Sequence, residues 1–278
     1  MAGFVFCLSR DEPETGMMYD LYIGIDYSGA ETMESRLKAL QVYAAEASSE
    51  PQSVRPAAPA RNWSRQEIAH WLLARIQAGA RILVGVDHGF SFPQSYFERY
   101  RLDSWPAFLD DFCRYWPTAE PYIYVDFVRD GTVWERRTKP PGERTGRPGE
   151  LRLCERWTSS AKSVFQFDMQ GSVAKSTHAG IPWLHFLREQ CGERLFFWPF
   201  DGWQPPEGKS VIAEVYPSIF RNRYQKNGRT GDEQDAFAVA RWLEETNHNG
   251  LLERYFNPPL TLLERRTAEL EGWILGIS

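Results

Sequence analysis

Short apolar runs alternate along the chain with longer segments in which apolar positions recur every three or four residues. The short runs are rich in β-branched and aromatic residues, which is typical of buried strands. We predict strands at 20–27, 36–45, 81–87, 194–199 and 210–216. Three of the longer segments open with a capping box, a Ser or Thr followed three residues later by Glu, and so predict helices. The boxes begin at Ser64, Thr230 and Thr261.

Proline and glycine set further boundaries. Gly79 closes the helix that begins at Ser64, and Pro117 ends a helix that begins at Ser104. A fifth helix is predicted to open at Pro182 and to end near Gly192.

The segment around 118–160 is predicted as an insertion with two parts. Residues 121–137 indicate a hairpin that turns at Asp130-Gly131, the dipeptide most typical of a tight hairpin turn. Residues 138–150 hold three Pro, three Gly and mixed charge, and we predict a mobile loop there.

The order of these elements predicts an α/β fold. Strands 20–27 and 36–45 follow one another across a short turn and should pair antiparallel, whereas the helix between 64 and 77 makes strand 81–87 parallel to the first. We therefore expect a mixed central sheet with helices on both faces, formed by one domain over 20–278. Residues 1–19 are predicted to be an N-terminal extension.

Composition narrows the possible partners. The chain has 278 residues, 42% of them hydrophobic, and a net charge of −5, so it is globular and not an indiscriminate polyanion binder. Any contact with nucleic acid should be local or assisted by cations. Its four cysteines are far apart, which argues against a zinc cluster or a disulfide framework and fits the cytoplasm. No apolar run approaches the roughly 20 residues of a membrane span, so no membrane contact is expected.

One pattern, apolar-Gly-apolar-Asp, occurs twice, at 23–26 and at 84–87. Side chains alternate along a strand, so Asp26 shares a face with Gly24, and Asp87 with Gly85. We expect open space beside each carboxylate. Because an unpaired buried acid is costly, two such acids on neighbouring strands predict half of a divalent-metal site.

Two more carboxylates stand at positions where packing favours apolar residues. Glu214 lies in a strand that is apolar on both sides, and Asp235 lies on the apolar stripe of the helix that opens at Thr230. Each acid alone has an ordinary structural explanation, such as a turn, an Arg partner or a first helical turn. Together with Asp26 and Asp87 they predict ligands for Mg²⁺ or Mn²⁺ and two-metal phosphoryl transfer, with Asp232 as an alternative ligand.

The segments at 22–26, 85–87, 213–217 and 232–240 together resemble a predicted-nuclease family of unknown function. That family belongs to the ribonuclease H-like superfamily and is related to the RuvC resolvase type. The shared feature is the order strand Asp, strand Asp, strand Glu and helix Asp, and the resemblance covers residues from about 20 to about 246. It implies a ribonuclease H-like fold, a nuclease activity and a nucleic-acid substrate.

Other residues are candidates for contact with substrate. Arg221 and Arg223 lie between the Glu214 strand and the Asp235 helix, where they could bind phosphates or belong to a solvated loop. Ser28 follows Asp26 in its turn and could bind a metal water or shape that turn. Lys175 lies in a segment, 171–177, that resembles the tail of a phosphate loop but lacks its second Gly, so a plain loop is favoured.

Two other functions remain open at this point. The Gly-flanked turns after Asp26 and Asp87 also resemble the phosphate turns of actin- and sugar-kinase-type phosphotransferases. The second alternative is a non-catalytic module on the same fold that binds nucleic acid or protein.

Overall fold

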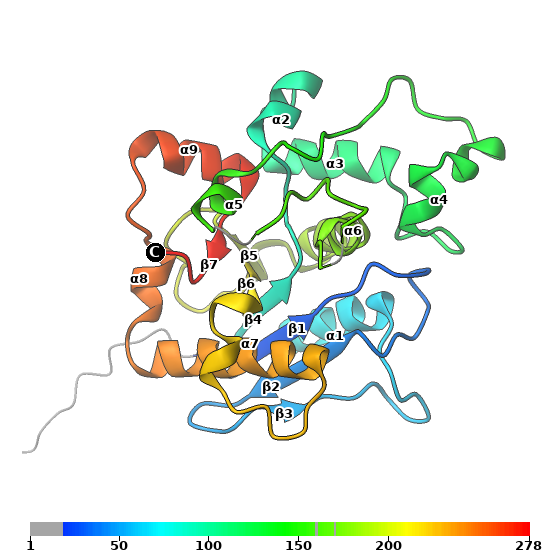
Figure 1. Ribbon diagram of the computed structural model, residues 1–278. Helices are drawn as coiled ribbons and strands as arrows, with labels where there is room; N and C mark the ends of the chain where they lie inside the picture. The colour runs from blue at the N-terminus through cyan, green and yellow to red at the C-terminus, as the bar shows by residue number, and fades with distance from the viewer. Residues whose placement is uncertain (1–18, 159–160, 170) are drawn as a thin grey trace, which may run out of the picture.

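The computed structural model describes residues 19–158, 161–169 and 171–278. Within them, seven strands form one sheet and helices pack against it (Figure 1). The strands are β1 (Leu21–Asp26), β2 (Gln41–Ala45), β3 (Gln52–Ser53), β4 (Ile82–Asp87), β5 (Leu195–Trp198), β6 (Ser210–Val215) and β7 (Ile274–Leu275). The α-helices are α1 (Arg65–Gln77), α2 (Gln94–Tyr100), α3 (Trp105–Tyr115), α4 (Val125–Arg129), α5 (Leu153–Trp157), α6 (Ala174–Cys191), α7 (Gly231–His248), α8 (Leu252–Phe256) and α9 (Leu262–Glu271).

The sheet is mixed, as the order of elements predicts. Its strand order is β3-β2-β1-β4-β6-β5, and β7 also pairs with β6. The pairings of β1 with β2 and of β2 with β3 are antiparallel, whereas β1, β4, β6, β5 and β7 run parallel. The carboxyl ends of β1, β4 and β6 therefore meet at one edge of the sheet.

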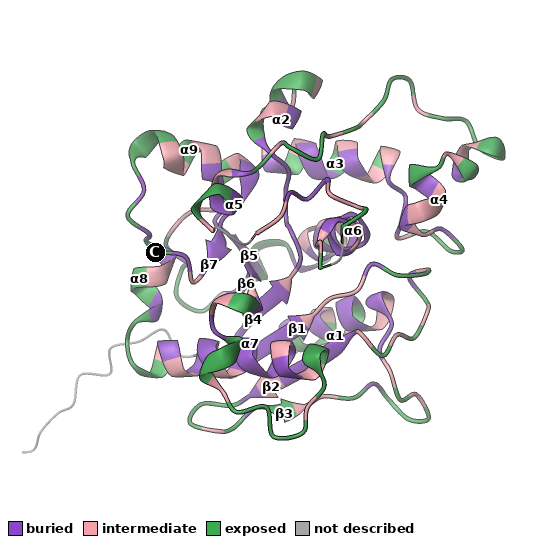
Figure 2. Cartoon of the chain, viewed as in Figure 1, coloured by how far each residue is buried: buried purple, intermediate pink, exposed green. Residues whose placement is uncertain are grey.

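Two hydrophobic cores lie on the two faces of this sheet. On one face Ile23, Val84 and Ile212 pack with residues of α1, α3 and α6. On the other face Tyr22, Leu83 and Val211 pack with residues of α7 and of the C-terminal segment. Figure 2 shows the sheet and the inner sides of these helices buried, so the strands are covered on both faces.

Local signals placed the elements that carry the candidate acids correctly. The capping boxes at Ser64, Thr230 and Thr261 are all formed and open α1, α7 and α9. The predicted parallel crossover from β1 through α1 to β4 is confirmed. Several short elements, among them α2, α4, α5, α8 and β7, were not predicted, and residues 1–18 of the expected extension lie outside the described residues.

The hairpin predicted over 121–137 is wrong. This segment forms α4 and a short 3₁₀-helix at Thr132–Glu135. Gly131 has φ of 87° directly after the helix end, and the Asp130 carboxylate accepts a hydrogen bond from the amide of Thr132 at 2.9 Å. An Asp-Gly pair ends a helix as readily as it turns a hairpin, because both need a left-handed residue.

The loop predicted as mobile over 138–150 is anchored to α2 and α3. Arg144 makes two hydrogen bonds with Asp111, at 2.6 and 2.8 Å. Tyr115 donates to the carbonyl of Pro141 at 2.5 Å, and Arg99 is paired with Glu150. These contacts hold the loop against the helices, although its composition alone favours mobility.

The helix predicted to open at Pro182 begins eight residues earlier, so Pro182 lies inside α6. Proline has no amide hydrogen, so the carbonyl of His178, one turn back, loses its helical partner. Thr118 supplies the missing donor, because its hydroxyl donates to that carbonyl at 2.7 Å. A residue 60 positions away in the chain therefore makes this internal proline tolerable.

We expect Thr118→Val to lower the free energy of unfolding by about 1–3 kcal/mol, the cost of leaving a buried carbonyl without a donor. Valine matches threonine in shape, so packing changes little. Urea unfolding followed by circular dichroism measures the difference, and Thr118→Ser, which keeps the hydroxyl, should lose less. Equal stability of the valine variant and the unaltered protein would contradict this role.

Candidate functional site

The two repeated Asp residues stand side by side. In the parallel pairing of β1 with β4, Asp26 lies opposite Asp87 and Gly24 lies opposite Gly85. Neighbours in such a register point to the same face of the sheet. The interaction between the two carboxyl groups raises the pKa of Asp26 and lowers that of Asp87. The sequence-based prediction that these acids meet is therefore confirmed.

The surroundings of the pair favour the protonated form of both acids. Burial raises the pKa of Asp26 well above its usual range, and the negative charge of Asp87 raises it further. Burial is also the main cause of the raised pKa of Asp87, followed by the charges of Asp235 and Glu214. Two acids so close cannot both ionise in a poorly solvated place unless a cation neutralises them.

The expected open space beside the carboxylates is not there. A Cβ atom at Gly24 would lie 2.1 Å from the carbonyl oxygen of Ala236, and one at Gly85 would lie 2.6 Å from a methyl group of Val239. Both glycines thus let α7 approach the strands closely. Because these two residues have no side chain, the helix packs directly against the sheet and fills the space that was expected for a ligand.

This close approach brings the acids of α7 to the pair. Asp235 is half-buried, and its charge raises the pKa values of both Asp26 and Asp87. Asp232, which is exposed, also raises the pKa of Asp26. Arg221 forms an ion pair with Asp235 at 3.0 Å. The structure therefore gathers four of the five predicted acids around one edge of β1 and β4.

Glu214 is the acid that does not join this group. It lies opposite Val86 in the pairing of β4 with β6, so it points to the other face of the sheet from Asp87. There its carboxylate accepts two hydrogen bonds from the Arg152 guanidinium, at 2.6 and 2.7 Å, and a third from the amide of Phe90 at 3.0 Å. This arrangement does not support its predicted role as a ligand.

Arg152 was missed by the sequence analysis. It is 1% exposed and also donates to Glu155 at 2.9 Å, so one buried cation holds two buried acids. A small pocket of about 20 Å³, room for about one water molecule, is lined by Asp87, Glu214 and Arg152. The Arg152 network therefore borders the acidic pair from the opposite face.

The turns that follow the two acids are packed against the start of α6. A Cβ atom at Gly29 would lie 2.0 Å from the carbonyl oxygen of Lys175, and one at Gly89 would lie 2.9 Å from the hydroxyl of Thr177. The same hydroxyl accepts a hydrogen bond from the amide of Gly89 at 2.9 Å. Both glycine turns are therefore filled by protein.

A second arginine that the sequence analysis missed holds the turn after Asp26. Arg65 is buried at the first position of α1 and donates to the carbonyls of Ser28, Ala30 and Glu31 at 3.1, 2.7 and 2.8 Å. An arginine directly after a helix cap gives no sequence signal for this role, because its partners precede it by more than 30 residues.

The predicted substrate-binding residues have mixed outcomes. Arg221 lies at the acidic group through its pair with Asp235. Arg223 is exposed and lines a separate surface hollow with Tyr224 and Arg229. Lys175 is paired with Asp126 of α4 at 2.7 Å. Ser28 is half-buried in its turn, and its hydroxyl accepts a hydrogen bond from the amide of Ala30 at 3.4 Å.

His88 is a packing residue in this structure. It is 2% exposed, its Nδ1 donates to the carbonyl of Gly89 at 2.8 Å, and it packs against the ring of Tyr27. Burial lowers its pKa to about 4, so the ring is neutral at physiological pH. This environment does not favour a role for His88 in proton transfer.

The carboxylates of Asp26 and Asp87 are suitable ligands for Mg²⁺ or Mn²⁺, although they are only two. Within the described residues, no group of three or more His, Cys, Asp or Glu side chains is arranged to hold a metal ion. However, Mg²⁺ usually takes one or two protein carboxylates and completes its shell with water and substrate phosphates. Asp26 and Asp87 provide two such carboxylates, and a divalent cation beside them would favour their ionised forms.

Comparison of the chain with protein-family models, with curated proteins and with solved structures found no match to any of them. Over residues 19–158, 161–169 and 171–278, none of the helices combines the length and the apolar character needed to span a membrane.

Proposed function

We propose that this protein is a nuclease that uses Mg²⁺ or Mn²⁺ to hydrolyse phosphodiester bonds, on a ribonuclease H-like fold. One observation carries the proposal: Asp26 and Asp87 lie in register at the ends of parallel neighbouring strands, where burial and the nearby carboxylates raise the pKa of both. The mixed sheet, with its antiparallel start and parallel crossover, agrees with the resemblance in the sequence.

In this proposal Asp26 and Asp87 are the primary metal ligands. Asp235 and Asp232 lie close enough to influence the charge of the pair, and they would bind a second ion or the waters of the first. A bound divalent ion would supply an activated water and stabilise the leaving oxygen. Arg221 would then bind a substrate phosphate, since it already lies beside Asp235 with its side chain 43% exposed.

The structure argues against the phosphotransferase alternative. Nucleotide phosphates bound at glycine turns need free backbone amides and space in front of them. Here the turns after both acids are occupied by Lys175 and Thr177 of α6, and the amide of Gly89 is already bonded to Thr177. We therefore favour a phosphodiester substrate that approaches from the side of α7 and Arg221.

Cleavage assays test the proposal directly. The purified protein should cleave at least one of four substrates, namely single-stranded DNA, duplex DNA, an RNA–DNA hybrid or a branched junction, with Mn²⁺ or Mg²⁺ but not with EDTA. We expect Asp26→Asn to lower the rate by more than about 100-fold, because a metal ligand that stabilises the reaction by several kcal/mol is replaced by a neutral amide.

The matched control is Asp103→Asn, the same substitution at an exposed aspartate that is not one of the predicted site residues. It should leave the rate unchanged. Full activity of Asp26→Asn would refute the assignment of this site, and cleavage that persists in EDTA would refute the metal dependence.

A further inference from the structure

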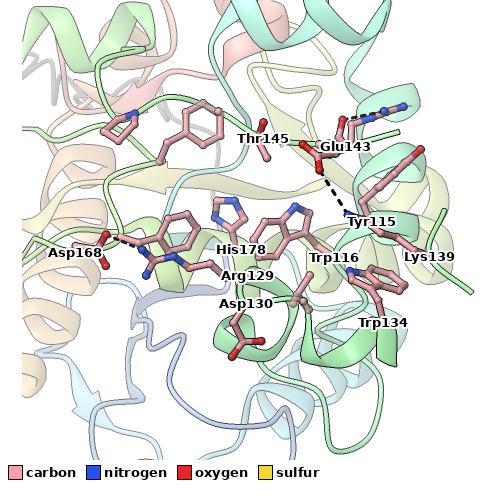
Figure 3. Close-up of a pocket in the computed structure, with 17 residues that line it drawn as sticks. Tyr115, Trp116, Arg129, Asp130, Trp134, Lys139, Glu143, Thr145, Asp168 and His178 are labelled. Carbon is pink, nitrogen blue, oxygen red and sulfur yellow. Dashed lines mark hydrogen bonds and ion pairs between the residues drawn. The ribbon is translucent and has the colours of Figure 1, made fainter. Parts of the chain in front are cut away.

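A large pocket lies apart from the acidic pair, between α3, α4, α6 and the loop that follows α4. Its volume is about 480 Å³, within the range of roughly 300–1,000 Å³ that small-molecule sites occupy. Aromatic side chains form much of its wall and cationic side chains stand at its rim (Figure 3). The aromatic members are Tyr115, Trp116, Trp134, Phe165 and Phe167.

The aromatic wall offers flat surfaces in a defined orientation. The rings of Trp116 and Phe167 are nearly parallel, with an angle of 11° between their planes and centroids 6.1 Å apart. Trp134 is only half-buried, so part of its ring remains available. Flat apolar surfaces of this kind favour a planar aromatic ligand, because stacking on a base contributes about 1–3 kcal/mol per base.

One polar atom in this wall has no hydrogen-bond partner among the residues that the structure describes. His178 is 1% exposed, and its Nδ1 lies 2.8 Å from the carbonyl oxygen of Ala174. A carbonyl only accepts, so Nδ1 carries the hydrogen, and burial lowers the pKa of the ring to about 3. Nε2 is therefore an acceptor, and no described residue donates a hydrogen bond to it.

Figure 3 places His178 beside Trp116, with Arg129 and Asp130 close by. The ring centroid of His178 lies 4.3 Å from that of Trp116 and 4.7 Å from that of Phe167. The imidazole ring that carries the unused acceptor thus packs against both of the parallel aromatic rings. A ligand that fills the pocket must stack on these rings and offer a hydrogen-bond donor at its edge.

The rim carries cations whose present partners hold them weakly. Arg129 pairs with Asp168 at 2.6 Å, but the Asp168 side chain is 81% exposed. Lys139 lies 3.7 Å from Glu143, and both of these side chains are largely exposed. Exposed pairs of this type contribute little to stability, so a phosphate could replace either acid at small cost.

We propose that this pocket binds a nucleobase, with the base stacked on the aromatic wall, an N–H of the base donated to Nε2 of His178, and the attached phosphate at Arg129 or Lys139. The base belongs either to a free nucleotide or to a nucleic-acid strand. The site needs no metal, so it stands whether or not the acidic pair is catalytic. The start of α6 connects the two places, since Thr177 bonds the turn after Asp87 and His178 lines the pocket.

Calorimetric titration of the full chain in EDTA tests this site without involving metal or cleavage. The probes are the adenosine, guanosine, cytidine and uridine monophosphates, with ribose 5-phosphate as the base-free control. At least one nucleotide should bind, and at least about tenfold more tightly than ribose 5-phosphate. No binding of any nucleotide or strand, or equal binding of ribose 5-phosphate, would overturn the proposal.

Two variants separate the stacking surface from the acceptor. Trp134→Ala should weaken nucleotide binding about tenfold, whereas Trp157→Ala, at a partly exposed tryptophan outside the pocket, should leave it unchanged.

For the acceptor we compare adenosine monophosphate with the purine analogue that lacks the amino group. The unaltered protein should prefer the adenine about fivefold or more, and His178→Phe, which keeps an aromatic ring, should lose that preference. If adenosine monophosphate does not bind, uridine monophosphate is compared with its N3-methyl analogue instead. If the unaltered protein shows no preference within the pair that is used, the role of His178 is overturned.

A further titration distinguishes a free nucleotide from a nucleic-acid strand as the source of the base. A single-stranded dodecamer and the same strand with abasic sites are titrated under identical conditions. Tighter binding of the intact dodecamer than of both the abasic strand and the mononucleotides assigns the pocket to a strand. If mononucleotides bind more tightly than the dodecamer and the dodecamer does not compete with them, the pocket is assigned to a free nucleotide. Loss of cleavage activity in Asp26→Asn leaves these titrations unaffected, so the two proposals fail independently.

Discussion

We expect Asp87→Asn to make the metal-free protein more stable and at the same time to abolish its response to Mn²⁺. In the folded state the half-buried acids Asp26 and Asp87 have raised pKa values, and keeping them from ionising costs free energy at neutral pH. An asparagine has nothing to ionise, and its amide can donate to the Asp26 carboxylate. The gain should be at most about 4 kcal/mol at pH 7, since the pKa of Asp87 rises from 3.8 to about 8 and each unit up to the working pH corresponds to about 1.36 kcal/mol.

The pH dependence of this gain follows from the direction of the shifts. The pKa values of both acids are raised in the folded state, so the unfolded chain releases protons that the folded chain retains. Stability of the unaltered protein is therefore lost as the pH rises from about 4, the usual value of Asp, through the raised values. The difference between Asp87→Asn and the unaltered protein should vanish near pH 4 and grow toward pH 8.

Thermal unfolding with and without Mn²⁺ measures both effects. A ligand that binds only the folded state stabilises it by RT ln(1 + [L]/Kd), so Mn²⁺ should raise the melting temperature of the unaltered protein. It should not raise that of Asp87→Asn, whereas Asp103→Asn should behave as the unaltered protein does. A variant that is no more stable in EDTA, or that responds fully to Mn²⁺, would show that the pair is an ordinary structural contact.

Short-range signals predicted the framework of the site well. The capping box at Thr230 depends on residues three apart, so it could be recognised from the sequence and placed Asp235 in the second turn of α7. The alternation along β1 and β4, together with one intervening helix, was sufficient to bring Asp26 beside Asp87. These features rest on contacts between residues that are close in the chain or on one topological rule.

The failures share a different cause, because each depends on a partner that is distant in the chain. Pro182 reads as the start of a helix unless Thr118 is known to satisfy the carbonyl of His178. Gly24 suggests open space unless the backbone of α7 is known to fill it. Glu214 reads as a metal ligand unless its register opposite Val86, and hence its face of the sheet, is known. No pattern within the chain reveals such partners before the fold is known.

The largest expected loss of stability comes from the partner of Glu214. We expect Arg152→Met to lower the free energy of unfolding by about 3–5 kcal/mol, the usual cost of removing one member of a buried ion pair. Methionine fills much of the same space, so the loss is mainly electrostatic. Glu214 and Glu155, both at most 5% exposed in their side chains, would be left without their cation.

Urea unfolding over a range of pH distinguishes this mechanism from a packing defect. Burial already raises the pKa of Glu155, and the charge of Arg152 opposes that rise. Without the arginine, the folded carboxyl groups should bind protons at higher pH than the unfolded ones do, so stability falls as the pH rises. The deficit of Arg152→Met should therefore be larger at pH 8 than at pH 5, whereas a packing defect would be the same at both.

Two further variants show whether Glu214 serves structure or metal. Adding Glu214→Gln to Arg152→Met removes one buried charge and should recover part of the lost stability. Arg36→Met, which breaks the exposed pair with Glu67, should cost less than about 1 kcal/mol. If Glu214 acts through Arg152 alone, Glu214→Gln by itself keeps the rise in melting temperature with Mn²⁺ that Asp87→Asn loses. If Glu214→Gln instead loses that rise in melting temperature, Glu214 belongs to the metal site even though it lies on the other face of the sheet.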